Sequence, residues 1–168
     1  MEAVLAYTKA THINVIGHSM GVTIGRRVLQ GGESVDQSAG TYSVGPSLKS
    51  KVNSFIGLAG GNLGLTACFG GSLIPTCSNI DGFNPGNLPT SGPSKYLASL
   101  NTAPAAEASK VYTIWSKFDT LIGTQCVVWG KVTCRIPGQT SEVVKDSLEW
   151  DHFAVRDKTG PDLINWLN

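Results

Sequence analysis

The strongest constraint on the fold lies in residues 13–30, where a short apolar run, a glycine-flanked turn and a helical segment follow one another. Residues 13–16 (INVI) have the β-branched character of a buried strand. The next five residues, Gly17 to Gly21, read GHSMG and fit the pattern G-x-S-x-G. We expect these two glycines to let neighbouring backbone pass where a Cβ would clash. The pattern therefore predicts a sharp turn that holds Ser19 in a strained conformation before a helix N-terminus.

Two further segments have the composition of buried strands, and helical segments alternate with them. The strands are predicted at residues 51–59 and 110–116, and the helices at residues 2–9, 20–30, 94–100 and 161–168. Ser94 is an expected N-cap, and Pro161 opens the last helix. This alternation predicts an α/β fold with a mostly parallel sheet. The length of 168 residues fits a single domain over 1–168.

The remaining segments are predicted to be irregular. Residues 33–50 are rich in serine and glycine and predict an exposed connection. Residues 68–93 predict a loop-rich excursion over one edge of the site, and residues 139–148 an irregular stretch.

Helix amphipathicity predicts which side chains face the core. In the first helix, Val4 and Leu5 are expected to turn inward. Arg26 and Arg27 are expected at the solvated face and the C-terminal end of their helix, where positive charge is favourable. The apolar face of the last helix consists of Leu163, Ile164 and Leu167.

The composition argues against several classes of partner. Charged residues make up 15% of the chain and the formal net charge is +1, so nucleic acid is not an expected partner. No apolar run approaches the ~18 residues of a membrane span. The first residues, MEAVLAY, lack the basic start and the long apolar stretch of a secretory leader.

The four cysteines fall into two close pairs, Cys68 with Cys77 and Cys126 with Cys134. Two local disulfides are the favoured interpretation, and four reduced thiols are the alternative. Zinc is disfavoured because no C-x-x-C spacing or nearby histidine pair occurs, so no metal site is expected. Disulfides imply an oxidising compartment, which conflicts with the missing leader. We therefore expect the chain to be incomplete at its amino terminus.

A serine nucleophile needs a base, and the base needs an orienting carboxylate. Of the three histidines, His12 precedes the first strand and is expected at the surface, and His18 is expected to line the pocket or to be structural. His152, on a late loop, is the favoured base. Asp119 directly follows the third strand, where catalytic groups of such sheets gather, and is the favoured acid. Other candidates for the carboxylate, each readable as a solvated loop acid, are Asp146, Asp151 and Asp157.

The chain resembles the carboxyl-terminal part of the class 2 lipases, small secreted enzymes with the α/β-hydrolase fold. The resemblance rests on NVIGHSMG, GLAGGNLG, the two cysteine-bearing loops, YTIWSKFDTLIG, and IPG followed by DHF. It implies hydrolysis of carboxylic esters, typically acylglycerols, through an acyl-serine intermediate without a cofactor. It also implies Ser19 as nucleophile, Asp119 as acid and His152 as base. The backbone N–H of Met20 would be one donor of the oxyanion hole.

One departure from the family has consequences for activity. Only eighteen residues precede Ser19, whereas this fold has several strands there, one of which leads to the second oxyanion donor. We therefore expect the strand at 13–16 to have an unpaired edge. Loss of one oxyanion donor costs ~10²–10³ in rate, so low activity is expected.

Two alternatives to a lipase stay open. One is an inactive homologue that binds lipid or acts as an interaction protein. The other is a different serine acyl hydrolase or acyltransferase, because the triad does not fix the leaving group. Transient contact with a lipid interface is expected of the lipase.

Overall fold

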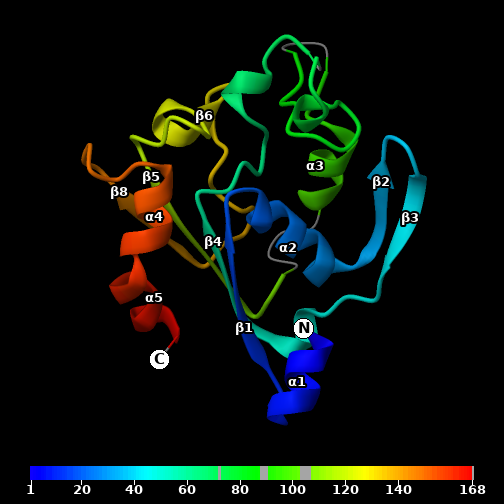
Figure 1. The fold of residues 1–168 in the computed structure, drawn as a ribbon, viewed down its shortest axis with the longest axis vertical. Helices are drawn as coiled ribbons and strands as arrows, with labels where there is room; N and C mark the ends of the chain where they lie inside the picture. Colours follow the sequence, from blue (N-terminus) through cyan, green and yellow to red (C-terminus); the bar gives the residue numbers. More distant parts are fainter. Residues whose placement is uncertain (72, 88–90, 103–106, 168) are drawn as a thin grey trace.

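The computed structural model describes residues 1–71, 73–87, 91–102 and 107–167. Its centre is a sheet of four parallel strands in the order β1-β4-β5-β8 (Figure 1). These strands are β1 (Ile13–His18), β4 (Val52–Leu58), β5 (Lys110–Ser116) and β8 (Ser141–Lys145). The first three confirm the sequence prediction, whereas β8 lies in the stretch predicted to be irregular. Within the described residues β1 pairs only with β4, so it has the predicted unpaired edge.

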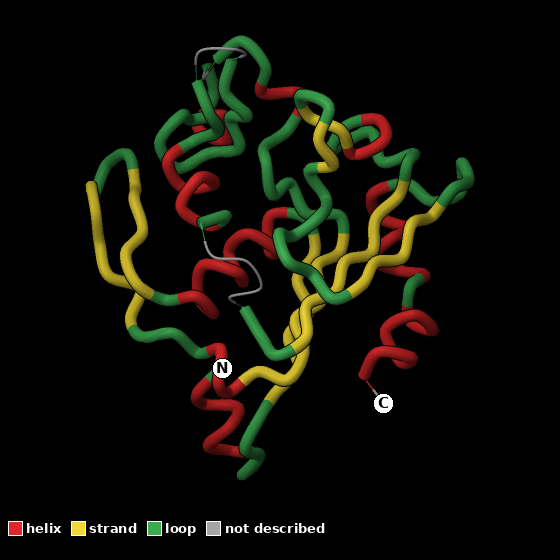
Figure 2. Tube along the Cα trace, turned by 180° about the vertical axis from the view of Figure 1, so that it is seen from behind, coloured by secondary structure: helices red, strands yellow, loops and turns green. Residues whose placement is uncertain are grey.

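Helices cover both faces of this sheet. The helices of the described residues are α1 (Glu2–Thr8), α2 (Met20–Gln30), α3 (Lys95–Leu100), α4 (His152–Lys158) and α5 (Gly160–Leu167), and those that cover the sheet are α2, α4 and α5. The helices α4 and α5 lie on one side of the sheet and α2 on the other, as both views show (Figures 1 and 2). The predicted cap of α3 is present, since the Ser94 side chain accepts a hydrogen bond from the N–H of Leu97 at 3.3 Å.

The core consists of two apolar layers because neighbouring strand residues face opposite sides. Phe55 and Val111 pack with Val22 in the layer beneath α2. Ile114 packs with Val155 of α4 in the second layer. Since both faces of β4 and β5 are buried, their sequences are continuously apolar, which is why sequence analysis found these strands.

Residues 32–45 form an antiparallel hairpin rather than a plain exposed connection. Its strands are β2 (Gly32–Asp36) and β3 (Gly40–Gly45). The hairpin projects beside α2 and α3 (Figure 1). Apolar and polar residues do not alternate clearly in this serine- and glycine-rich stretch, so the sequence pattern does not predict these two strands.

The loop-rich regions contain only short elements. They are the strands β6 (Val127–Val128) and β7 (Lys131–Val132) and 3₁₀ turns at Lys49–Lys51, Thr66–Cys68, Pro75–Cys77 and Thr124–Cys126. Both predicted disulfides, Cys68–Cys77 and Cys126–Cys134, are present there. Parts of the predicted excursion over 68–93, residues 72 and 88–90, lie outside the described residues. No described helix has the length and hydropathy to cross a bilayer.

Two predictions about the faces of the terminal helices are wrong. The first helix buries no residue, and Val4 is 52% exposed, so α1 does not use its apolar side chains for the core. Ile164 of α5 is 59% exposed, whereas Leu163 and Leu167 pack against the core as predicted.

Arg26 and Arg27 are buried rather than solvated. Arg26 lies on the core-facing side of α2, and its Nε donates to the carboxylate of Glu107 at 2.7 Å. Its two terminal nitrogens donate to Asn62, Asn101 and the carbonyl of Leu100. Arg27 donates to the carbonyl oxygens of Gly31 and Glu33 and to the hydroxyl of Ser99. The buried charge of Arg26 is tolerated because the carboxylate of Glu107 compensates it and three neutral acceptors contact it, whereas Nε of Arg27 is buried without a hydrogen-bond partner among the described residues.

Candidate active site

The predicted serine turn is present between β1 and α2. Ser19 has φ 55° and ψ −127°, a conformation that L-residues rarely adopt, and its N–H donates to the carbonyl of Leu58 at 2.8 Å. A Cβ on Gly17 would lie 2.7 Å from the carbonyl oxygen of Gly21, so glycine is required there. Gly21 has open space around it, which corrects the expectation that both glycines serve close approach. The turn thus holds Ser19 half-buried before α2.

Asp119 is fully buried in the loop that follows β5. One carboxylate oxygen, Oδ1, accepts hydrogen bonds from the N–H groups of Leu121 and Ile122 at 3.0 and 2.9 Å. The other, Oδ2, lies 2.7 Å from Nδ1 of His152. Two backbone donors therefore fix the carboxylate, and the carboxylate fixes the imidazole.

His152 is the first residue of α4, not part of a loop as predicted. Asp151 caps this helix: its Oδ1 accepts a hydrogen bond from the N–H of Ala154 at 2.7 Å. Asp151 is therefore a helix cap, and the structure favours Asp119 as the partner of His152. Because Nδ1 of His152 faces this carboxylate, Nε2 is the ring nitrogen left to accept a proton.

The other two histidines differ from each other in their exposure and in their contacts. His12 is exposed and its Nδ1 contacts only the hydroxyl of Thr11, at 3.0 Å, as a surface histidine should. His18 is half-buried beside His152, with ring centroids 4.6 Å apart. Its Nε2 lies 3.1 Å from the carbonyl oxygen of His152.

The structure thus brings together three of the predicted residues. Asp119 contacts His152, and His152 contacts His18, the chain neighbour of Ser19. Among the hydrogen bonds of the described residues, none joins the Ser19 hydroxyl to His152. The assignment of Ser19, Asp119 and His152 as a catalytic triad stays a prediction.

The backbone N–H of Met20 is the first of α2. No described residue accepts a hydrogen bond from it. An N–H at a helix N-terminus attracts negative charge. Its position directly after Ser19 is the one required of an oxyanion donor.

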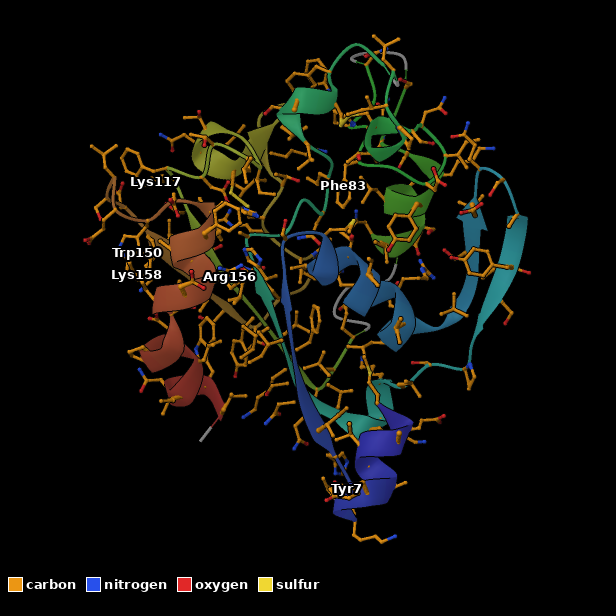
Figure 3. The ribbon with its side chains drawn as sticks, viewed as in Figure 1. Tyr7, Phe83, Lys117, Trp150, Arg156 and Lys158 are labelled. Atoms are coloured by element: carbon orange, nitrogen blue, oxygen red, sulfur yellow. A yellow bond between two sulfur atoms is a disulfide. The ribbon has the colours of Figure 1, made fainter. Side chains whose placement is uncertain are left out.

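An open cavity of about 600 Å³ begins at Met20. Phe83 forms part of its wall and lies between α2 and α3 (Figure 3). Asp36 and Asp81 also line it, and the N–H of Gln37 donates to Asp81 at 3.0 Å, which ties the hairpin to the 75–83 loop. Sequence analysis missed this wall because it did not predict the hairpin. Elsewhere in the described ranges, no group of three or more His, Cys, Asp or Glu residues is arranged to hold a metal ion.

The fold and the site together indicate the class of protein to which the chain belongs. A four-stranded parallel sheet, a G-x-S-x-G turn and a buried Asp–His pair at the carboxyl ends of the strands are consistent with the α/β-hydrolases. Within that class the chain belongs to the family described as Lipase (class 2), whose model matches residues 1–165. The comparison with curated proteins gave no match. Membership of a lipase family indicates a hydrolase with a lipid substrate.

Proposed function

We propose that the protein is a carboxylic ester hydrolase, a lipase acting on acylglycerols, with Ser19 as nucleophile, His152 as base and Asp119 as the orienting acid. The observation that carries the proposal is the 2.7 Å contact between Asp119 and His152, two buried residues beside the serine turn. This contact leaves one imidazole nitrogen free to act as a base.

The proposed reaction has two halves. The Ser19 hydroxyl attacks the ester carbonyl carbon while Nε2 of His152 takes the hydroxyl proton, and His152 then gives this proton to the departing alcohol. Water, activated by the same nitrogen, hydrolyses the acyl-serine and releases the carboxylic acid. Asp119 stabilises the imidazolium in both halves. The N–H of Met20 stabilises the negative oxygen, and no step requires a cofactor.

Apolar side chains around the site support a lipid substrate. Three apolar side chains, those of Met20, Leu121 and Phe153, are each about half-exposed. Each follows a proposed catalytic residue by one or two positions in the sequence. Exposed apolar groups at the mouth of a site favour contact with an aggregated lipid. The two disulfides support an extracellular protein, as the family resemblance implies.

The test combines labelling with substitution. An organophosphonate should modify Ser19, located by peptide mass analysis, and Ser19→Ala should lose both labelling and hydrolysis of a short p-nitrophenyl ester, the latter by ~10⁶-fold. Ser50→Ala, at an exposed serine, is the matched control and should keep both. Retained hydrolysis in Ser19→Ala would overturn the proposal. Binding of apolar ligands without labelling would favour a non-catalytic lipid-binding protein instead.

A further inference from the structure

We propose that His18 is a positioning residue that holds the backbone of His152 against the serine turn. This inference rests on the proposed function, because it assigns His18 a role in placing the base. His18 is the last residue of β1, and His152 is the first residue of α4. The contact therefore links the strand before the nucleophile to the helix that carries the base.

The hydrogen bond has only one possible direction. Nε2 of His18 lies 3.1 Å from the carbonyl oxygen of His152, and a carbonyl oxygen can only accept. His18 must therefore carry a proton on Nε2. Because this bond acts on the main chain of His152, it positions the backbone of the base and involves neither of its ring nitrogens.

The two rings are also in contact. Their centroids are 4.6 Å apart and their planes are inclined by 46°. On its other side, the His152 ring is held by Asp119 through Nδ1. His152 is thus held at two points: Asp119 sets the ring orientation, and His18 sets the distance between α4 and the serine turn. Without the second contact, α4 could shift while the Asp–His bond stays intact.

The surroundings of His18 favour its neutral form. Burial lowers the pKa of His18 from its ordinary value of 6.5, and the neighbouring charges of His152 and Arg156 lower it further. The hydrogen bond to the His152 carbonyl and the charge of Asp119 raise the pKa of His18 in part. Asp157 is the remaining charged group near enough to interact with His18. A neutral ring beside His152 does not oppose the imidazolium that forms during the reaction.

Three substitutions separate the hydrogen bond from the ring contact. His18→Ala removes both, His18→Phe keeps a ring without a donor, and His18→Gln keeps a donor at the same distance along the side chain. A displacement of about 1 Å can cost ~10²-fold in rate, so we expect kcat to fall ~10–100-fold in the alanine and phenylalanine variants with KM nearly unchanged. His18→Gln should recover most of kcat. His12→Gln, at an exposed histidine, is the matched control.

The pH profile of kcat/KM gives a readout that a merely structural role would not move. In the unchanged protein, protonation of His18 in acid adds a positive charge beside His152, and this charge opposes the imidazolium that forms during the reaction. The acid limb should therefore be shallower in His18→Gln than in the unchanged protein. Thermal unfolding midpoints, measured in parallel, ensure that all variants are compared while folded.

The outcomes distinguish this inference from the proposed function. If Ser19→Ala is inactive and His18→Ala keeps full kcat, the positioning role is wrong and the serine hydrolase stands. If Ser19→Ala stays active, the proposed function itself fails. Equal losses in His18→Gln and His18→Ala, with the acid limb unchanged, would also reject the positioning role, since the donor would not matter.

Discussion

Two buried side-chain pairs in this molecule have the same length and different surroundings. Arg26 and Glu107 lie 2.7 Å apart behind α2, and His152 and Asp119 lie 2.7 Å apart at the carboxyl ends of the strands. Each joins segments that are distant in sequence, by 81 and 33 residues. Arg26 uses its three nitrogens on four acceptors, whereas the described contacts of the His152 ring nitrogens involve Nδ1 alone.

This difference in surroundings distinguishes a pair that stabilises the fold, Arg26–Glu107, from a pair suited to proton transfer, His152–Asp119. A buried guanidinium that already donates to four acceptors is held for structure and does not give up its proton. An imidazole with one nitrogen anchored and one free can exchange a proton near neutral pH. Breaking either pair should therefore affect a different property: activity for Asp119–His152 and stability for Arg26–Glu107.

Of the changes that break one of these pairs, Asp119→Asn has the largest expected effect. An amide at this position leaves the shape intact but can hold His152 in the wrong tautomer, so kcat should fall ~10⁴-fold, about 5.5 kcal/mol in the activation barrier. Stopped-flow or steady-state hydrolysis of an activated ester measures the loss of kcat. The thermal unfolding midpoint should stay close to that of the unchanged protein.

The matched control for this loss is Asp146→Asn. Asp146 is an exposed carboxylate that pairs with Lys117 at 2.5 Å. Its substitution should leave kcat within about twofold, as surface pairs contribute little. If Asp119→Asn kept more than a tenth of the activity, His152 would not depend on this carboxylate.

The second effect is on stability. Glu107→Ala leaves the buried charge of Arg26 uncompensated, which typically costs about 3–5 kcal/mol of unfolding free energy. Chemical denaturation measures this loss. Activity per folded molecule, counted by organophosphonate titration, should stay within about twofold, because the described Arg26–Glu107 contacts include neither Asp119 nor His152.

An exposed pair provides the control for this stability loss. Glu2 and Lys51 lie 3.4 Å apart with largely exposed side chains, so Glu2→Ala should cost no more than about 0.5 kcal/mol. A Glu107→Ala protein as stable as Glu2→Ala would mean that the Arg26 charge is compensated by its neutral acceptors alone.

Sequence analysis predicted the contact between Asp119 and His152 and missed the one between Arg26 and Glu107, for physical reasons. Asp119 was found because parallel strands bring their carboxyl ends to one edge, a rule that depends only on strand order. Arg26 shares its helix face with Val22 and Leu29, at spacings of four and three residues, so periodicity alone pointed inward. The prediction went wrong because the charge of Arg26 was given more weight than its position. Its partner Glu107 is too distant in sequence for any local pattern to reveal.

Two parts of the fold were missed in the same way. The strand β8 (SEVVK) carries charged residues at both ends, yet it completes the sheet by pairing with β5. The hairpin β2–β3 is stabilised largely by its own pairing and by contact with α2 and α3. Edge strands and hairpins depend on tertiary neighbours, which a single sequence does not display.

The smallest expected effect belongs to a third pair, which is partly exposed. Glu142 contacts Arg135 and also accepts a hydrogen bond from the Trp115 indole at 2.9 Å. The contact with Arg135 lowers the pKa of Glu142 from its ordinary 4.5, with the Trp115 hydrogen bond lowering it further. A carboxyl whose pKa is lower in the folded state stabilises the protein above its unfolded pKa, and this contribution disappears as the pH falls through the folded value. Glu142→Gln should therefore lose about 1 kcal/mol or less near neutral pH, and the difference should vanish in acid.

Chemical denaturation of the unchanged protein and of Glu142→Gln across the acid range measures how their unfolding free energies converge. Glu33→Gln serves as the control because Glu33 forms no ion pair among the described residues. Activity should be unaffected in both variants. If Glu142→Gln instead cost as much as Glu107→Ala at neutral pH, burial would not be what separates strong pairs from weak ones. Hydrogen-bond geometry would not explain the difference either, because it is similar in the two pairs. Nε of Arg26 and Nε of Arg135 each donate to a carboxylate oxygen, at 2.7 and 2.8 Å.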